Sequence, residues 1–231
     1  DSLVILPSPD FEFTLCGQEC LDPEDGNSNW VPAPSLTACD EDPQGIDYEW
    51  NLFQFDYEGG VIQNGGQLAF STTDTNLLIE ADSAGVYCPV VTLCNNWGTH
   101  TCCTSSPNPG DEPDDDDNCW YVRPLPIPVL GFEQESICIP TQAEITNASI
   151  GATQTTIEIL DTTVVDFESP FVYPIEFPGY YNVWFEACKE WLPPPCADPT
   201  IETENLVCCV DTEYTAAFEG CLPPIASFDA P

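Results

Sequence analysis

The stretch GVYCPVVTLCNNW at residues 85–97 decides the fold, because a second version of it, GYYNVWFEACKEW, occurs at residues 179–191. The two copies share Gly, Tyr, Cys and Trp at one constant offset, and Cys102 and Cys196 keep the same offset. Self-similarity at a fixed distance marks a repeated structural unit. The sequence therefore predicts two homologous domains.

Both copies alternate large apolar residues with smaller or polar ones. This two-residue period is typical of a β-strand with one buried face. Gly, Pro, Asn and Asp separate further short apolar stretches at the spacing of antiparallel sandwiches. No stretch shows a helical period, so we expect little helix. The other expected strands cover residues 4–6, 11–15, 48–55, 67–71, 77–80, 144–147, 155–160, 163–167 and 216–218.

The segment SSPNPGDEPDDDDN at residues 105–118 separates the two copies. Its turn-forming residues and massed negative charge do not pack in a core. We therefore predict a first domain over residues 1–104 and an acidic linker over residues 105–118. A second domain, which ends in a joining segment, is expected over residues 119–231.

Fourteen cysteines indicate disulfides, since zinc sites bring CxxC pairs or nearby histidines and the sole histidine is His100. Disulfides persist in oxidising compartments, so we expect a secreted protein at the cell surface. Each predicted domain holds seven cysteines, so complete oxidation requires a bond between the halves or a bond from each half to another chain. The predicted disulfide cysteines are Cys16, Cys20, Cys39, Cys88, Cys94, Cys102, Cys103, Cys119, Cys138, Cys188, Cys196, Cys208, Cys209 and Cys221.

The charge of the chain excludes several partners. Forty acidic residues against two basic ones give a net charge of -38. Nucleic acid and anionic membrane surfaces repel such a chain, so neither is an expected partner. No apolar run reaches the roughly 18 residues that cross a bilayer, and we expect no membrane insertion. Because the sequence begins at Asp1 without Met or a signal peptide, we expect a mature or excised segment.

At this point a family resemblance emerges. Residues 173–185, YPIEFPGYYNVWF, resemble the late G-x-Y-x-V-x-L strand of PKD domains, which are Ig-like sandwiches repeated in bacterial and archaeal surface proteins. Residues 85–93 form a less complete copy. Residues 138–149, CIPTQAEITNAS, are similar to the C-x-P-x-x-V-x-F-x-N-x-S opening of repeats in large Bacteroidetes-type adhesins. Trp50 stands where the family places its central-strand tryptophan.

The resemblance implies an all-β chain of two tandem Ig-like (PKD-like) antiparallel β-sandwich domains stapled by disulfides. The W-x-F-G-D-G signature of the family is missing, since NLFQF follows Trp50 and the second half has only IEI at residues 157–159. PPIASF at residues 223–228 resembles the start of a further PKD repeat. The chain is therefore expected to be one unit of a longer array, or to exchange end strands with neighbouring subunits.

The acidic run in the predicted linker offers hard oxygen ligands, which suit the 6 to 8 oxygen coordination of Ca²⁺. It lacks the D-x-D-x-D-G spacing and the terminal glutamate of an EF-hand. We expect no required cofactor, and calcium binding here is a hypothesis beside that of an extended, self-repelling linker. The candidate metal ligands are Asp111, Glu112, Asp114, Asp115, Asp116 and Asp117.

We expect no enzyme. Catalytic carboxylates need burial or a specific partner to separate their pKa values, and two basic residues offer few partners. His100 has neither a second histidine nor a G-x-S-x-G motif beside it, so we interpret it as a surface loop residue.

Tryptophan and one asparagine supply the remaining candidates. Trp97 and Trp191 follow the repeated cysteines by three residues, and we interpret them as core packing beside disulfides. Trp184 falls on the strand face opposite Tyr181, so it is an expected surface contact. Asn147 opens an N-x-S sequon and is a candidate glycosylation site, although the N-x-S strand end of the PKD-like repeats explains the same residues.

These observations predict a non-enzymatic extracellular structural or adhesive protein, a subunit or repeat segment of a surface filament or long adhesin. Its expected partners are copies of itself or adjacent repeats, joined through residues 1–15 and 213–231. Strand addition at a sheet edge is one route, and covalent continuity of one long chain is the other. The alternative is a secreted carbohydrate-binding or recognition module that stacks surface glycans on exposed aromatic side chains. A secreted acidic hydrolase is the functional hypothesis that we expect least.

Overall fold

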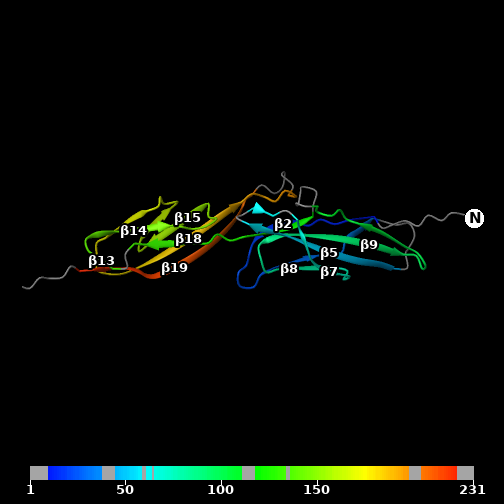
Figure 1. Ribbon diagram of the computed structural model, residues 1–231, viewed down its shortest axis with the longest axis horizontal. Coiled ribbons are helices and arrows are strands. Elements are labelled where there is room, and N and C mark those ends of the chain that lie inside the picture. The colour runs from blue at the N-terminus through cyan, green and yellow to red at the C-terminus, as the bar shows by residue number, and fades with distance from the viewer. Residues whose placement is uncertain are drawn as a thin grey trace, which may run out of the picture. The chain divides into compact units, whose positions relative to one another are not determined.

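The structure is a computed structural model that describes residues 10–37, 45–58, 61–63, 65–110, 118–133, 136–197 and 204–222. Every regular element in these ranges is a β-strand, and none of the ranges contains a helix long and apolar enough to cross a membrane. The all-β prediction is confirmed. The chain forms two compact units (Figure 1). The first comprises Asp1–Pro124 with Trp191–Leu206, and the second Leu125–Glu190 with Val207–Pro231.

The strands of the first unit form one large sheet and two small ones. They are β1 (Asp10–Glu12), β2 (Cys16–Cys20), β3 (Asn27–Val31), β4 (Ser35–Thr37), β5 (Gly45–Glu58), β6 (Val61–Ile62), β7 (Gln67–Thr72), β8 (Leu77–Ala81), β9 (Gly85–Asn96), β10 (Thr101–Ser105) and β11 (Cys119–Arg123). The large sheet has the order β2-β11-β9-β5-β6, with β10 paired to β9 and β7 to β5. β3 pairs with β8, and β1 with β4.

The core of the first unit lies between the β3-β8 sheet and one face of the large sheet. In β8, Leu77 and Ile79 are buried while Leu78 between them is exposed, which is the alternation of a half-buried strand. Trp50 of β5 is fully buried and donates its indole N–H to the carbonyl of Asp74 over 3.0 Å. A second buried cluster lies on the opposite face of the large sheet. It consists of Phe55, Val86, Cys88, Cys119 and Tyr121.

The strands of the second unit form two sheets. They are β12 (Leu130–Phe132), β13 (Ser136–Cys138), β14 (Thr141–Asn147), β15 (Gln154–Ile159), β16 (Thr162–Val165), β17 (Phe171–Ile175), β18 (Gly179–Trp191) and β19 (Leu206–Cys221). The order is β12-β14-β17 in the smaller sheet and β13-β19-β18-β15-β16 in the larger. Ile145 and Ile175 of the smaller sheet join Ile157 and Phe185 of the larger in one buried cluster.

The larger sheets of the two units share their strand order. β2, β11, β9 and β5 stand in the first unit where β13, β19, β18 and β15 stand in the second, and the first pair is parallel in both. Each motif tyrosine donates its hydroxyl to the carbonyl four residues upstream, Tyr87 to Ser83 over 2.8 Å and Tyr181 to Phe177 over 2.9 Å. The repeat in the sequence thus has a counterpart in the structure.

The division of the chain differs from the predicted one. β10 and β11 flank residues 106–118, and both strands belong to the large sheet of the first unit. The acidic segment therefore interrupts one unit, and the boundary between units falls after Pro124. The physical reason is that all five residues of β11 are buried, so this strand fits only the interior of a sheet, next to β9 and β2.

Candidate functional site: cross-strand disulfides and a caged arginine

The repeated cysteines make equivalent bonds in the two units. Cys94 of β9 bonds Cys103 of β10, and Cys188 of β18 bonds Cys209 of β19. In each case the partner is the second member of a vicinal Cys-Cys pair on the next strand. The Cα–Cα distances are 4.0 and 4.1 Å, so both bonds join neighbouring strands.

Two further disulfides fasten the first unit. Cys88 of β9 bonds Cys119 of β11, with a Cα–Cα distance of 4.3 Å. Cys16 of β2 bonds Cys196, which is 180 positions away in sequence and lies in the Trp191–Leu206 segment. Both bonds join a cysteine before the acidic segment to one after it, yet both lie within the first unit.

The remaining cysteines have different states. Cys20 and Cys208 are disulfide-bonded, and Cys102 lies in β10 with Asn95 as its register partner. Cys138 and Cys221 are thiols. Cys39 lies outside the described residues.

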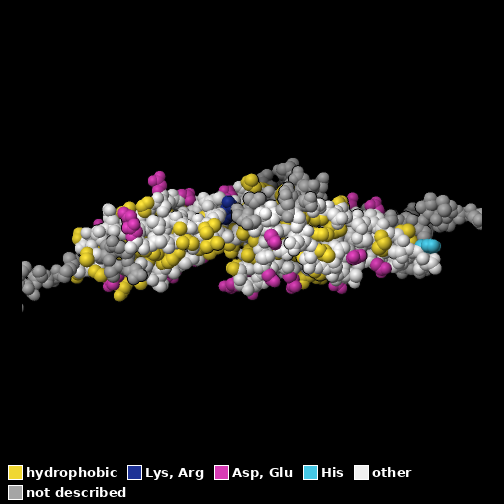
Figure 2. Space-filling view, viewed as in Figure 1, with side chains coloured by type: hydrophobic (Ala, Val, Ile, Leu, Met, Phe, Trp, Pro, Cys, Tyr) yellow, Lys and Arg dark blue, Asp and Glu magenta, His cyan; other side chains and the backbone are white. Residues whose placement is uncertain are grey.

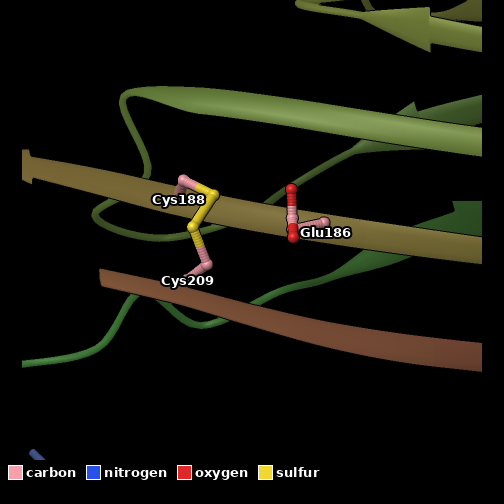
Figure 3. Close-up of side chains that lie close together, drawn as sticks. All are labelled: Glu186, Cys188 and Cys209. Atoms are coloured by element: carbon pink, nitrogen blue, oxygen red, sulfur yellow. A yellow bond between two sulfur atoms is a disulfide. The ribbon is translucent and has the colours of Figure 1, made fainter. Parts of the chain in front are cut away.

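One cluster brings together residue types that often bind metal. The ligand atoms of Glu186, Cys188 and Cys209 lie within 4.8 Å of one another, with Glu186 and Cys188 on β18 and Cys209 on β19 (Figure 3). The two sulfur atoms share one disulfide, whereas the sulfur form that binds metals is the thiolate. The arrangement thus places a carboxylate beside a disulfide.

Arg123, at the end of β11, is the polar residue that sequence reasoning missed. It is only 7% exposed, and its guanidinium lies among three aromatic rings. Its Cζ is 4.8 Å from the ring centroid of Tyr121, 5.2 Å from that of Trp191 and 6.0 Å from that of Tyr57. Cation–π attraction of this kind reaches about 2 kcal/mol when the cation is desolvated.

The N–H groups of Arg123 bind three neutral acceptors. They donate to the Tyr57 hydroxyl over 2.6 Å, to Gln18 Oε1 over 2.9 Å and to the Leu192 carbonyl over 3.4 Å. Burial raises the pKa of Tyr57, and the neighbouring guanidinium opposes this rise. The arrangement ties the returning Trp191–Leu206 segment to β2, β5 and β11 of the first unit.

A signal for Arg123 was present in the sequence. The chain has only two basic residues, and this one follows Cys-Trp-Tyr-Val at residues 119–122. A lone cation inside a buried aromatic strand is a candidate for cation–π packing.

The other predicted site residues are distributed as follows. All six candidate calcium ligands, at residues 111–117, lie outside the described residues. Asn147 is half-buried at the end of β14, where its Nδ2 donates to Thr155 Oγ1 over 3.3 Å and its Oδ1 accepts the Ser149 N–H over 3.0 Å. His100 is exposed, and its carbonyl accepts the backbone N–H of Trp97 in the turn between β9 and β10.

The tryptophans fall into distinct environments. Trp184 is half-buried, on the strand face opposite the buried Tyr181. Trp191 packs on Arg123 and on the ring of Tyr57, at a centroid distance of 5.9 Å. Trp30 is 59% exposed on the outer side of the β3-β8 sheet.

Comparison with known proteins assigns no family. No protein-family model matches the sequence, and a search of curated proteins found no match.

Proposed function

We propose that the chain is a non-enzymatic extracellular structural subunit or repeat segment of a surface filament or long adhesin, built from two Ig-like (PKD-like) sandwiches. The observation that carries the proposal is the repeated architecture. In each unit a strand with a tyrosine corner lies between the same neighbours and is bonded to the next strand by a disulfide. A tyrosine corner is a hallmark of Ig-like sandwiches.

The covalent bonds suit a load-bearing role. Because Cys94–Cys103 and Cys188–Cys209 join neighbouring strands, force along the chain cannot separate those strands without breaking an S–S bond. Acidic side chains are spread over both units on the face drawn in Figure 2. A net charge of -38 keeps such a surface solvated, and dissolved cations screen its self-repulsion.

Assembly requires an edge that can accept a neighbour. The described parts of the expected joining segments already pair within the chain, since β1 pairs with β4 and residues 219–221 of β19 pair with β13. β16 forms one edge of the larger sheet in the second unit. An edge strand offers unpaired backbone groups to an added strand. We therefore assign the joint to β16.

The test measures polymers of the full chain, with and without calcium, by sedimentation velocity and electron microscopy. Val165→Lys places a charge on β16 and is expected to abolish linear polymers, because edge lysines block strand addition. Val207→Lys is the matched control, since both valines are 52% exposed and Val207 lies in β19, which β18 and β15 separate from β16. Polymers that persist in Val165→Lys would refute the joint at β16. Monomers at every concentration would refute the filament subunit and favour a repeat segment of one long adhesin.

A recognition module is the second candidate, and exposed aromatic surface favours it. Trp30 and Leu78 are register partners on the outer face of the β3-β8 sheet, 59% and 42% exposed. If this pair stacks on sugar rings, Trp30→Ala lowers glycan-array binding by about tenfold, a loss of about 1.4 kcal/mol. Leu160→Ala, at a 68% exposed position in the second unit, is the control and leaves binding unchanged.

A further inference from the structure

We propose that Cys138 and Cys221 form a redox-controlled latch. A disulfide oxidant converts their two thiols into a bond that fastens β13 to the end of β19. Both residues are thiols in the structure, Cys138 exposed and Cys221 half-buried. An oxidant in solution therefore reaches Cys138 first.

The backbone places the two cysteines side by side. β13 runs parallel to β19, and Cys138 is the register partner of Cys221. The Ile139 N–H donates to the Cys221 carbonyl over 3.0 Å, which fixes the register at this point. Neighbouring strands lie about 4.8 Å apart, inside the range of about 4.4–6.8 Å that disulfides span between Cα atoms.

Both side chains point away from the core. Phe218 is buried in the core cluster, and Ile139 packs against the same cluster. A Cβ added to Gly220 would lie 3.3 Å from Cγ2 of Ile139, so Gly220 faces the core side as well. Because strand side chains alternate, Cys221 and Cys138, next to Gly220 and Ile139, lie together on the outer face.

The chain already contains linkages of this kind. Three of its disulfides join neighbouring strands with Cα–Cα distances of 4.0 to 4.3 Å. In one of them Cys94 and Cys103 are themselves register partners. A bond between Cys138 and Cys221 needs no rearrangement of strands.

The reaction is a thiol–disulfide exchange with a low-molecular-weight disulfide, RS–SR. The Cys138 thiolate attacks one sulfur of the oxidant, forms a mixed disulfide and releases RS⁻, which takes up the proton lost from Cys138. The Cys221 thiolate then attacks the Cys138 sulfur and releases the second RS⁻, which takes the proton from Cys221. Two protein thiols lose two electrons, and one RS–SR becomes two RSH.

The bond would fasten the edge strand β13 to its sheet covalently. β13 has only three residues and forms the outer edge of its sheet. Without the bond, the described contacts that hold it to β19 are backbone hydrogen bonds. With the bond, β13 cannot leave β19 even if those hydrogen bonds open. This inference is independent of the filament proposal.

The test equilibrates the full chain, with its other disulfides intact, in ratios of oxidised to reduced glutathione. Free thiols are alkylated, and peptides are mapped by mass spectrometry. We expect a Cys138–Cys221 linked peptide, with a loss of about 2 Da for the two hydrogens removed. The bond should reverse in excess reduced glutathione, and the melting temperature of the second unit should rise by several degrees on oxidation, because a cross-link restricts the unfolded chain.

A displaced thiol provides the matched control. The variant Cys221→Ser with Glu219→Cys keeps the thiol on the same face but moves it two residues along β19. Its Cα is then about 8 Å from that of Cys138, beyond the span of a disulfide. The double variant Cys138→Ser with Cys221→Ser cannot form the bond. If the melting temperature of this variant equals that of the reduced chain, the fold does not depend on the bond.

Three results would overturn the latch. The first is alkylation of both cysteines at the highest oxidant ratio. The second is a bond from Cys138 to another copy of the chain, seen as a covalent dimer. The third is equal cross-linking in the displaced-thiol variant.

Discussion

The parallel strand pairs of the two units place cysteines opposite each other, but the first unit uses them differently from the second. In β2 and β11, Cys16 faces Cys119, and each of these is bonded to a third segment. In β13 and β19, Cys138 faces Cys221, and both are thiols. In the first unit, disulfides to other segments hold both cysteines of the facing pair. In the second unit both cysteines are thiols, and in our proposal redox conditions control the bond between them.

The cores differ in a parallel way. Trp50 of β5 is the register partner of Val91 of β9, and Ile157 of β15 is the partner of Phe185 of β18. Val91 and Phe185 are related by the repeat offset, so the two pairs are equivalent. The bulky aromatic ring has moved from one strand to its neighbour, which preserves core volume. The second unit therefore keeps the same sheet order although it has isoleucine at the position equivalent to Trp50.

The largest predicted losses in the free energy of unfolding come from large-to-small substitutions at these paired core positions. Trp50→Ala is expected to destabilise the first unit by about 3–5 kcal/mol, and Phe185→Ala the second by a similar amount, because each leaves a large cavity. Ile157→Val, the smaller change at the position equivalent to Trp50, should cost about 1 kcal/mol. Urea titration followed by amide hydrogen exchange separates the units. A loss at Ile157 as large as that at Trp50 would contradict the equivalence.

Removal of the repeated disulfides should give the next largest effects. Their sequence separations are 21 for Cys188–Cys209 and 9 for Cys94–Cys103. In the chain-entropy description, losing these loops costs about 3 and about 2.5 kcal/mol. Paired Cys→Ser variants measured by thermal unfolding provide the comparison. A greater loss at Cys94–Cys103 would show that chain entropy does not set the order.

Arg123 has no counterpart at the end of β19, and its replacement sharpens the contrast between the units. Arg123→Met removes three hydrogen bonds from a charged donor and is expected to cost about 2 kcal/mol, since some packing survives. The amides of residues 191–197 should then exchange faster. Lys189→Met removes the same charge from β18 and is the control. Equal exchange in both variants would show that charge, rather than the aromatic cage, holds the segment.

The sequence supports prediction of strands where the period is clear. The expected strands at residues 67–71, 77–80 and 155–160 match β7, β8 and β15 within a residue, because alternation or β-branched composition marks them. β2, with the sequence CGQEC, has neither feature, and its position depends on pairing with β11. The domain boundary was misplaced because charge and turn residues cannot show that the strands on both sides belong to one sheet.

The site was less accessible from sequence than the fold. Seven cysteines on each side of the acidic segment predict a bond that crosses it, and both Cys16–Cys196 and Cys88–Cys119 cross this segment while they lie within the first unit. Which cysteines meet depends on strand register, and register is set by the whole sheet. The cage of Arg123 likewise joins β2, β5, β11 and the Trp191–Leu206 segment, which are distant in sequence.

The smallest predicted effects concern the two tyrosine corners. Tyr87→Phe and Tyr181→Phe each remove one hydroxyl-to-carbonyl bond and should destabilise their units by about 1 kcal/mol at neutral pH. Equal losses would support equivalent corners, and a loss in only one unit would contradict them. Both variants keep the ring, so cavity formation does not contribute.

Alkaline pH then tests the first corner further. Burial raises the pKa of Tyr87 above its ordinary value, although the hydrogen bond with Ser83 opposes this. A raised pKa means that the folded state favours the neutral phenol. The resulting stability is fully present below about pH 10, the ordinary tyrosine pKa, and is lost as pH rises through the folded-state pKa. Phenylalanine does not titrate, so the stability advantage of the wild-type chain over Tyr87→Phe should shrink above pH 10 in urea titrations at stepped pH. An advantage that stays constant would mean that ionisation of Tyr87 is not coupled to unfolding of the first unit.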